Sequence, residues 1–547
     1  MGDPSRSGVD VLVIGVDALC HGVLSRLSPD TTPTIHRLVE AGASGPLESQ
    51  LPPWTPSAWP SIYTGVNPGK HGVFGFLRFE GYDWDVVNAT DVREHAVWEL
   101  LSDHGHRSVV VNVPVTHPPA AFDGALIPGY TAPADPACHP EGLLSEVRDE
   151  IGGYRLYNEQ LVEGATRDQR VDGYEEVVGM RGRAFRYLLD RERPAFGFLQ
   201  FQQSDTVFHE FPDDDEAVER VFRAIDEEIA ETLAVADPDA TLLVSDHGIG
   251  PIGDVEFRPN AYLRDRGDVV TSAAAEKPSW SQLSRERLRG GVDDGGEQGD
   301  DASLPVAVAE RALAAMAGLG LTSQRIGTVL ATLGLDDAVV RLVPGDLVRA
   351  GSEHVDFAAS RAYMRDRIEL GIRINLAGRE PEGTVDPSEY RSLRESLIGE
   401  LSDLRTPAGD AVFDDVLARE EVYDGPYVEE APDVLVVPRN FDVYLSSTVR
   451  DQPFGSPRES WSHKLCGIVA VNGREIPASD LRGAHLYDVT PTVLSLLGVP
   501  VSDRMDGSAL PVVEETERAS PPPYEGDSEP TDDAAVEDRL SNLGYLE

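Results

Sequence analysis

Short apolar runs alternate with amphipathic helical segments through the first half of this chain, and that alternation limits the folds open to it. VDVLVIGVD (residues 9–17), AFGFLQF (195–201) and ATLLVSD (240–246) have the composition of buried strands. Between the last two lies DEAVERVFRAIDEEIAETLAVA (215–236), whose apolar residues recur with helical spacing. Strands that alternate with helices of this length form parallel βαβ units. The sequence therefore predicts an α/β protein with a doubly wound, mostly parallel sheet.

Further elements of the same kind follow along the chain. HAVWELLSDHGH (95–106) predicts a helix, and SVVVNVPV (108–115) predicts the strand after it. Near the other end, CGIVAVNG (466–473) has the composition of a core strand, and DVTPTVLSLLG (488–498) that of a closing helix. We therefore expect both halves of the chain to contribute to one α/β core.

The alternation is interrupted between residues 267 and 345, where an acidic, glycine-rich segment is followed by apolar helical stretches. We expect an inserted helical cap there. It would separate a first part of the core, residues 1–266, from a second part, residues 346–512, which has an α+β subregion. Residues 513–547 are acidic and carry SPPP, so we expect an acidic linker and a C-terminal tail.

Polar side chains stand where the predicted strands end, which is where ligands bind in open parallel sheets. Three are aspartates and three are histidines: Asp17, Asp205, His209, Asp246, His247 and His463. Carboxylate with imidazole suits zinc, manganese or iron(II). A catalytic ion typically keeps only three protein ligands, so six residues predict two divalent metal ions, a pair that suits phosphoryl displacement.

Each of these residues also has an ordinary structural interpretation. Asp17 and Asp246 stand where helix N-caps are common. DTVFH, with Asp205 and His209, could be a solvated surface turn. His463 could be a histidine with no special role, as most of the thirteen histidines must be. The glycines after Asp246 and His247 predict a turn in which the backbone approaches another group.

Thr55, in PPWTPSAWPSIYTG, is the candidate nucleophile. A threonine hydroxyl is a poor nucleophile at neutral pH, and metal coordination would activate it. If a helix begins here, its N-terminal N–H groups would favour an anionic phosphate. The structural alternative is a threonine N-cap with Pro56 at the first helical position.

Several stretches, taken in order, resemble the alkaline phosphatase superfamily. They are VLVIGVDAL, TPSAWPSIYTGVNPGKHGVFGF, DTVFH, SDHG, SHKLCGI and YDVTPTVLSLLGVPVSDRMDG. Within it, the chain is most similar to the type I phosphodiesterase/nucleotide pyrophosphatase branch, and its middle stretch resembles prokaryotic members. The resemblance covers residues 9 to 510 without the 267–345 segment.

The resemblance implies a role for each matching position. Asp17, Asp246 and His247 would hold one ion, with Thr55 bridging to it as the nucleophile. The other ion would be held by Asp205, His209 and His463. Both would be zinc, and a phosphothreonine intermediate would form and then be hydrolysed. A donor to the substrate phosphate would be a backbone N–H or Lys70, which could equally be a surface charge, although the chain has only three lysines.

We therefore expect a two-metal hydrolase of a small phosphorylated substrate, acting on phosphodiester or nucleotide pyrophosphate bonds. The alternatives are a phosphomonoesterase, a phosphonate hydrolase or a phosphotransferase on the same core. A catalytically silent, acidic binding protein is the alternative from another class.

The charge balance adds expectations about surroundings. Asp and Glu number 95 against 47 Lys and Arg, a net charge of −48 spread over the chain. Such a surface repels nucleic acid, so we expect no nucleic acid to bind. A strongly acidic surface is also typical of adaptation to molar salt, where charges are screened within about 3 Å.

No apolar run is long enough to cross a membrane and no signal-peptide pattern opens the chain, so we expect a cytoplasmic protein. Three cysteines without CxxC spacing predict no disulfide framework.

Overall fold

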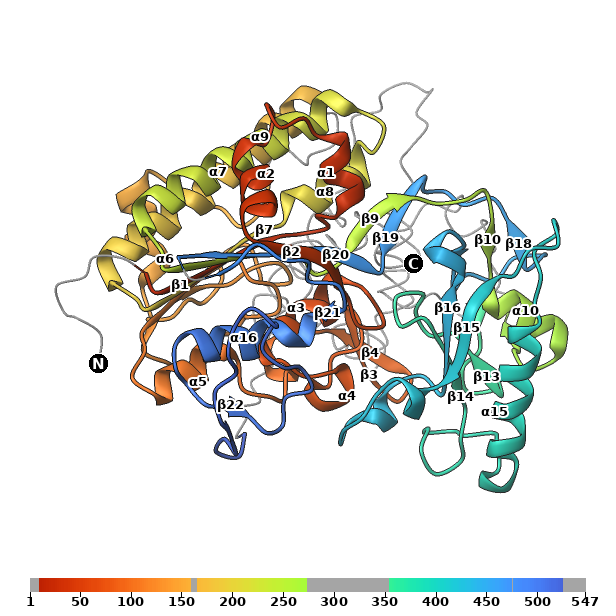
Figure 1. Ribbon diagram of the computed structural model, residues 1–547. Helices are drawn as coiled ribbons and strands as arrows, with labels where there is room; N and C mark the ends of the chain where they lie inside the picture. The colour runs from red at the N-terminus through yellow and green to blue at the C-terminus, as the bar shows by residue number, and fades with distance from the viewer. Residues whose placement is uncertain (1–8, 159–164, 273–353, 475, 525–547) are drawn as a thin grey trace, which may run out of the picture.

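The computed structural model describes residues 9–158, 165–272, 354–474 and 476–524 (Figure 1). Its centre is an eight-stranded sheet in the order β21-β2-β20-β8-β1-β7-β5-β6. The strands are β1 (Val11–Val16), β2 (Ala43–Glu48), β5 (Ser108–Val111), β6 (Gly124–Ile127), β7 (Phe196–Phe201), β8 (Ala240–Val244), β20 (Cys466–Gly473) and β21 (Ala484–His485). All neighbours pair in parallel except β20, which runs antiparallel to β2 and β8. The predicted doubly wound, mostly parallel sheet is confirmed.

Helices cover both faces of this large sheet (Figure 1). One layer consists of α1 (His21–Arg26), α2 (Pro33–Ala41), α6 (Leu143–Ile151), α7 (Arg167–Glu192), α8 (Gln203–Glu210) and α9 (Asp215–Ala236). The other consists of α3 (Thr55–Thr64), α4 (Pro68–His71), α5 (Val97–Asp103) and α16 (Val489–Leu496). The central strands are therefore buried on both sides, which explains why they appear in the sequence as continuous apolar runs.

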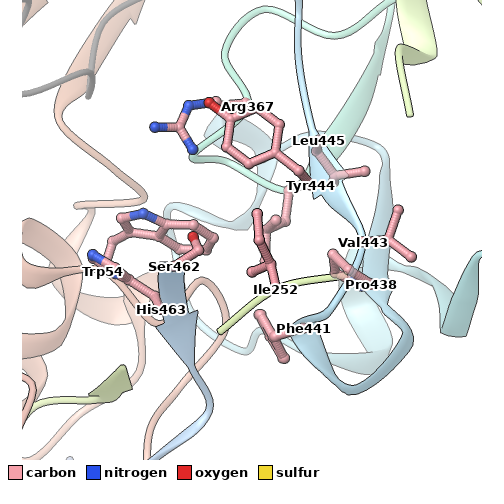
Figure 2. A pocket seen from close by; sticks show the side chains of 11 residues that line it. Trp54, Ile252, Arg367, Pro438, Phe441, Val443, Tyr444, Leu445, Ser462 and His463 are labelled. Carbon is pink, nitrogen blue, oxygen red and sulfur yellow. The ribbon is translucent and has the colours of Figure 1, made fainter. Parts of the chain in front are cut away.

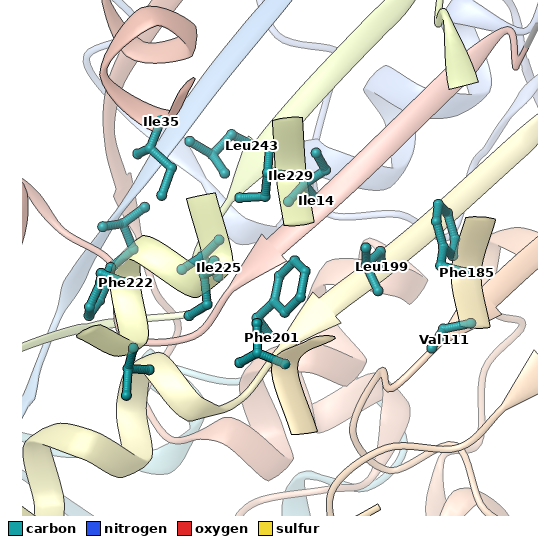
Figure 3. Close-up of a cluster of buried hydrophobic side chains, with 14 of the residues drawn as sticks. Ile14, Ile35, Val111, Phe185, Leu199, Phe201, Phe222, Ile225, Ile229 and Leu243 are labelled. Atoms are coloured by element: carbon teal, nitrogen blue, oxygen red, sulfur yellow. The ribbon is translucent and has the colours of Figure 1, made fainter. Parts of the chain in front are cut away.

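Side chains of β1 alternate between two hydrophobic cores. Leu12 and Ile14 belong to the core under α7 and α9, whereas Val11 and Val13 belong to the core under α3 and α16. Figure 3 shows the first core, in which sheet residues such as Ile14 meet the residues that α9 contributes. The two cores hold the strand ends, and the residues that follow them, in fixed positions.

Strand β5 is shorter than the predicted 108–115. It ends at Val111, because Asn112 and Val115 adopt left-handed backbone conformations with φ of 65° and 58°. Strand pairing requires an extended backbone, so the apolar run continues past the strand without forming part of it.

A second, smaller sheet lies beside the large one, in the order β13-β14-β16-β15 (Figure 1). Its strands are β13 (Ala362–Tyr363), β14 (Gly371–Ile374), β15 (Phe413–Ala418) and β16 (Val434–Pro438), and helices α10 (Pro259–Arg266) and α15 (Pro387–Ser402) pack with them in a third core. Three further strands, β10 (Glu256–Phe257), β17 (Tyr444–Leu445) and β18 (Phe454–Gly455), form a separate small sheet. Most of these strands and α15 lie within residues 346–512, whereas β10 and α10 come from before residue 267.

The predicted helical cap lies almost wholly outside the described residues. Its first residues instead form β11 (Thr271–Ser272), which pairs antiparallel with β12 (His354–Val355). Within the range expected as an acidic linker, β23 (Arg518–Ala519) pairs with β22 (Val501–Ser502), and residues 525–547 lie outside the described residues. A hairpin of β3 (Leu77–Glu80) and β4 (Asp83–Val86) completes the described strands, apart from β9 and β19 below.

Among the helices in the described part of the chain, none combines the length and apolar character that crossing a lipid bilayer requires. The three cysteines, all of which the structure describes, are free thiols.

Candidate active site

Two aspartates face each other because β1 and β8 are neighbours in the large sheet. The strands pair in parallel, with Gly15 beside Val244. Asp17 follows β1 and Asp246 follows β8 at the same edge of the sheet, and both side chains are fully buried. Neither caps a helix, since Cys20 is the N-cap of α1 and a strand follows Asp246.

A short antiparallel pair of strands brings His463 to His247. The glycines after Asp246 and His247 do not form the predicted turn; they belong to β9 (Gly248–Pro251), which pairs with β19 (Trp461–Lys464). A Cβ at Gly248 would lie 2.3 Å from the carbonyl oxygen of Cys466, so the backbone approach was correctly expected there. The imidazole rings of His247 and His463 are stacked with their centroids 4.0 Å apart.

Thr55 is the first residue of α3, and Trp54, not Thr55, is the N-cap. The predicted alternative of a capping threonine is therefore wrong, and the hydroxyl is not used to cap the helix. Instead, Thr55 Oγ1 lies 3.3 Å from His247 Nε2. All ten residues of α3 are buried, so the nucleophile candidate is held by a helix with no freedom to move into solvent.

Asp205 and His209 lie four residues apart on α8 and therefore on one face of that helix. Asp205 is 1% exposed and the His209 side chain 8% exposed. A solvated surface turn at this position is excluded. The helix follows β7 directly, which places both side chains at the same edge of the sheet as Asp17 and Asp246.

We call Asp17, Thr55, Asp246 and His247 the Thr55 set. His247 Nε2 lies 3.2 Å from Asp246 Oδ2 and 3.5 Å from Asp17 Oδ1. Nδ1 of the same ring donates to the Gly248 carbonyl oxygen at 3.0 Å, so Nε2 presents its lone pair. Asp17 Oδ1 and Asp246 Oδ2 are buried and have no hydrogen-bond partner. Lone pairs that face one another in a buried site are stabilised by a cation or a proton between them.

We call Asp205, His209 and His463 the His463 set. His209 Nε2 lies 3.3 Å from Asp205 Oδ1 and 3.2 Å from His463 Nε2, which is 3.8 Å from Asp205 Oδ1. His463 Nδ1 donates to the Pro53 carbonyl oxygen at 3.0 Å, so its Nε2 also presents a lone pair. A hydrogen bond from the far ring nitrogen to a carbonyl is the usual way a metal-binding histidine is oriented.

The two sets differ in electrostatics. Burial raises the pKa of Asp17 well above its usual value, and the charges of Asp246 and Asp205 raise it further. Burial likewise raises the pKa of Asp246, to about 6. Burial would also raise the pKa of Asp205, but His209 and His463 lower it overall. The pKa of His209 is raised by Asp205 despite burial, which acts in the opposite direction.

The donor atoms of the described residues fit divalent metal ions. Those of Asp17, Asp246 and His247 lie within 4.8 Å of one another, and so do those of Asp205, His247 and His463. His209 adjoins the second group through His463. Mixed carboxylate and imidazole donors favour zinc, manganese or iron(II) over magnesium or calcium. The structure thus brings together all seven residues that the sequence singled out as nucleophile and ligands.

Two residues that sequence analysis missed orient Asp17. Trp59 Nε1 and Gln200 Nε2 donate to its Oδ2 at 3.0 and 2.9 Å, while Asn112 Nδ2 donates to Gln200 Oε1 at 2.6 Å. Gln200 could have been noticed as the one strongly polar residue in the apolar run FGFLQF. Trp59 reaches Asp17 because Gly15 has no side chain: a Cβ there would lie 2.5 Å from the Trp59 ring.

Lys70 lies on α4 and is engaged elsewhere. Its ammonium forms an ion pair with Asp506 and donates to the Arg504 carbonyl oxygen at 3.0 Å. A role in substrate binding stays a prediction, and it would require Lys70 to leave these partners.

A small pocket opens beside His463 (Figure 2). Most of its lining is apolar and comes from the N-cap of α3, the β9–β19 pair and the region of the smaller sheets. The lining residues are Trp54, Ile252, Arg367, Leu370, Pro438, Phe441, Val443, Tyr444, Leu445, Ser462 and His463.

Comparisons with known proteins agree with this architecture. The sequence profile of the family described as type I phosphodiesterase / nucleotide pyrophosphatase matches residues 11–315, more than half of the chain. No curated protein matches the chain.

Among solved structures, phosphonoacetate hydrolase from Sinorhizobium meliloti 1021 in complex with phosphonoformate superposes with a TM-score of 0.53 at 15% identity, over 88% of this chain and 94% of that one. The alkaline phosphatase PafA superposes with a TM-score of 0.52 at 13% identity, over 93% of this chain and 100% of that one. At these identities the likeness shows a shared fold of the alkaline phosphatase type.

Proposed function

The chain belongs to the type I phosphodiesterase/nucleotide pyrophosphatase family, and on that premise we propose that it hydrolyses phosphodiester or nucleotide pyrophosphate bonds, with Thr55 as the nucleophile and two divalent metal ions as cofactors. Family membership supports hydrolysis of phosphoesters in general. The diester preference, the phosphothreonine intermediate and the zinc identity are the further parts of the proposal.

One observation carries the proposal. The Thr55 hydroxyl lies 3.3 Å from His247 Nε2, a donor atom of the ligand candidates. It is buried beside two carboxylate oxygens that have no hydrogen-bond partner. The neighbouring carboxylates alone would raise the pKa of this hydroxyl, so we assign its activation to the metal ions.

The ions, when bound, would supply positive charge that lowers the pKa of the Thr55 hydroxyl and offsets charge on the phosphoryl oxygens. The protein's part is to hold the groups in place. In this proposal the Thr55 set positions the attacking oxygen, and the leaving oxygen would depart toward the His463 set. An in-line displacement requires that arrangement.

Helix α3 adds one backbone donor for the phosphate. The N–H groups of Trp54, Ser57 and Ala58 are bonded to carbonyl oxygens of the same turn, and Pro56 has none. The amide of Thr55 is thus the first-turn donor left for an anionic group at this helix N-terminus. We assign to it the role for which the sequence suggested a backbone N–H or Lys70.

Hydrolysis of bis-p-nitrophenyl phosphate, beside p-nitrophenyl phosphate, tests the proposal. The assay uses Zn²⁺ or Mn²⁺ in molar KCl, because we propose that the charge of −48 reflects adaptation to high salt. Diester turnover should exceed monoester turnover and should be lost in Thr55→Ala and with a chelator. A radiolabelled or mass-shifted Thr55 peptide after rapid acid quench would identify the phosphothreonine.

Thr64→Ala is the matched control. Thr64 is a second buried threonine of α3, but its Oγ1 donates to the Pro60 carbonyl oxygen at 2.6 Å, within the helix. This variant should keep diesterase activity. Turnover of monoesters alone would keep Thr55 and overturn the diester preference. Equal losses in both variants would overturn the nucleophile assignment.

A further inference from the structure

Arg181 is a buried arginine with no carboxylate partner among the residues that the structure describes. It lies in the middle of α7 and is 2% exposed. Its Nη2 donates to the Leu156 carbonyl oxygen at 2.8 Å. Its Nε and Nη1 are buried and have no hydrogen-bond partner in the described part of the chain. A guanidinium stays protonated in proteins, so Arg181 brings a full positive charge into the interior.

The surroundings of Arg181 are apolar and aromatic. Residues three and four positions apart share a helix face, so Arg181 lies on the same side of α7 as Val178 and Phe185. Both belong to the core that also contains Val111 of β5 (Figure 3). Tyr154 is buried in the same core, and its hydroxyl, like two nitrogens of Arg181, has no partner among the described residues. Unpaired donors therefore gather in an otherwise apolar region.

The charge of Arg181 is not compensated by its described neighbours. Burial lowers the pKa of Arg181 to about 10, and the groups that act against this effect are Tyr154 and Tyr157. Neither is a carboxylate. Burial raises the pKa of Tyr154 to about 12, so this side chain is neutral at physiological pH. The Tyr157 hydroxyl donates to the Ala132 carbonyl oxygen at 2.6 Å and so keeps its proton.

Arginines elsewhere in the chain show how such a charge is usually balanced. Arg186, also on α7, has Nη1 2.6 Å from a carboxylate oxygen of Glu228. Arg373, which is buried near the smaller sheet, has Nε 2.7 Å from a carboxylate oxygen of Glu380. A buried ion without a partner is strongly unfavourable, whereas a paired one is tolerated. Arg181 therefore calls for an anion from outside the described residues.

We propose that Arg181 binds a chloride ion. Chloride needs only N–H and O–H donors, and these are what Arg181 and the Tyr154 hydroxyl offer. Because the donor atoms are closed off from solvent, the site suits a monatomic ion better than a phosphate or an organic acid. The site contains no residue of the Thr55 set or the His463 set, so it does not depend on the proposed function.

Chloride that binds only the folded chain should stabilise it by mass action. The metal-loaded wild type is unfolded by heat in potassium chloride and in potassium isethionate, an anion too bulky for a closed site, at equal potassium concentration and pH. Above the dissociation constant, the equilibrium constant for folding should rise about tenfold for each tenfold rise in chloride. The midpoint temperature should therefore be higher in chloride than in isethionate. Equal midpoints in the two salts would overturn the inference.

Arg181→Met tests whether this dependence comes from Arg181. The variant keeps a long side chain and removes the charge, so its midpoint should be the same in both salts. Arg186→Met is the matched control, because Arg186 lies on the same helix and already has carboxylate partners. It should keep the wild-type difference between the salts. A chloride effect that persists in Arg181→Met, or that disappears in both variants alike, would contradict a site at Arg181.

Bromide provides a readout that needs no variant. It replaces chloride and scatters X-rays anomalously, so wild-type crystals grown in potassium bromide should show an anomalous peak within hydrogen-bond distance of Arg181 Nε or Nη1. A water molecule without anomalous signal in that position, or a carboxylate of the chain, would overturn the inference. Diesterase activity would be unaffected by that outcome, so the proposed function stands or fails separately.

Discussion

The Thr55 set and the His463 set use the same residue types in opposite proportions. The first has two carboxylates and one imidazole, and the second has one carboxylate and two imidazoles. Burial and mutual repulsion raise the pKa values of Asp17 and Asp246, whereas the two histidines hold the pKa of Asp205 low. The first set therefore depends on an added cation, and the second partly compensates its own charge. We expect the Thr55 set to bind its ion more tightly.

The largest effect should come from removing one carboxylate of each set. Asp246→Asn removes one of the two carboxylates of the Thr55 set and should lower kcat for bis-p-nitrophenyl phosphate by ~10³-fold, the scale of losing a central electrostatic group. Asp205→Asn should lower it comparably. Metal analysis should give one ion per chain in each variant instead of two. Two ions retained in Asp246→Asn would contradict the assignment of that set.

Stepwise chelation tests the expected difference in affinity directly. The wild type, dialysed against increasing chelator, should pass through a state with one ion per chain. Asp205→Asn should then hold its single ion at chelator concentrations that empty Asp246→Asn, because two carboxylates attract a divalent cation more strongly than one. Identical release curves would remove the distinction between the sets.

A smaller effect is expected from the residue that orients Asp17. Gln200→Met keeps the volume but removes the donor to Asp17 Oδ2 and leaves Asn112 without its acceptor on that side chain. Loss of such a supporting hydrogen bond typically costs ~10–100-fold in activity or metal affinity. The loss should appear in the Thr55 set alone, so the tighter ion becomes easier to remove while the weaker one is unchanged. Release of the weaker ion instead would show that Gln200 acts elsewhere.

Gly15→Ala should reduce stability more than chemistry. The new methyl group would lie 2.5 Å from the Trp59 ring, so that ring, a donor to Asp17, must shift. Overpacking of this kind typically costs ~1–3 kcal/mol of unfolding free energy. Gly399→Ala is the control, because Gly399 lies on α15 with open space around it. Gly105 also has open space, but its positive φ would strain an alanine. Denaturant unfolding should separate the two variants.

The smallest effect concerns a histidine that the two sets do not include. His71 Nε2 lies 2.9 Å from Ser61 Oγ and its Nδ1 accepts from the Val73 amide at 3.2 Å, so both nitrogens are used internally. Burial lowers its pKa to about 3. The unfolded chain binds a proton near pH 6.5 and the folded one does not, so stability should fall as pH drops from about 6.5 toward 3. The free energy of unfolding of His71→Gln should therefore change less with pH over that window than that of the wild type. Each protein is compared with its own free energy of unfolding at pH 7.

The sequence determined the central sheet and the chemistry at its edge. Strands buried on both faces must be continuously apolar, so β1, β7 and β8 were recognisable, and so were the polar residues that end them. The sequence also singled out Thr55, although it left open a capping role that α3 excludes.

Only the tertiary structure decided which groups meet. His463 joins His247 through the pairing of β9 with β19, more than 200 residues apart, and Gln200 and Trp59 act on Asp17 through side-chain directions that no local pattern encodes. The pocket beside His463 likewise combines segments that are distant in the chain. Local sequence sets backbone propensity and burial, whereas hydrogen bonds and electrostatic contacts depend on distances of a few ångströms between elements, which only packing fixes.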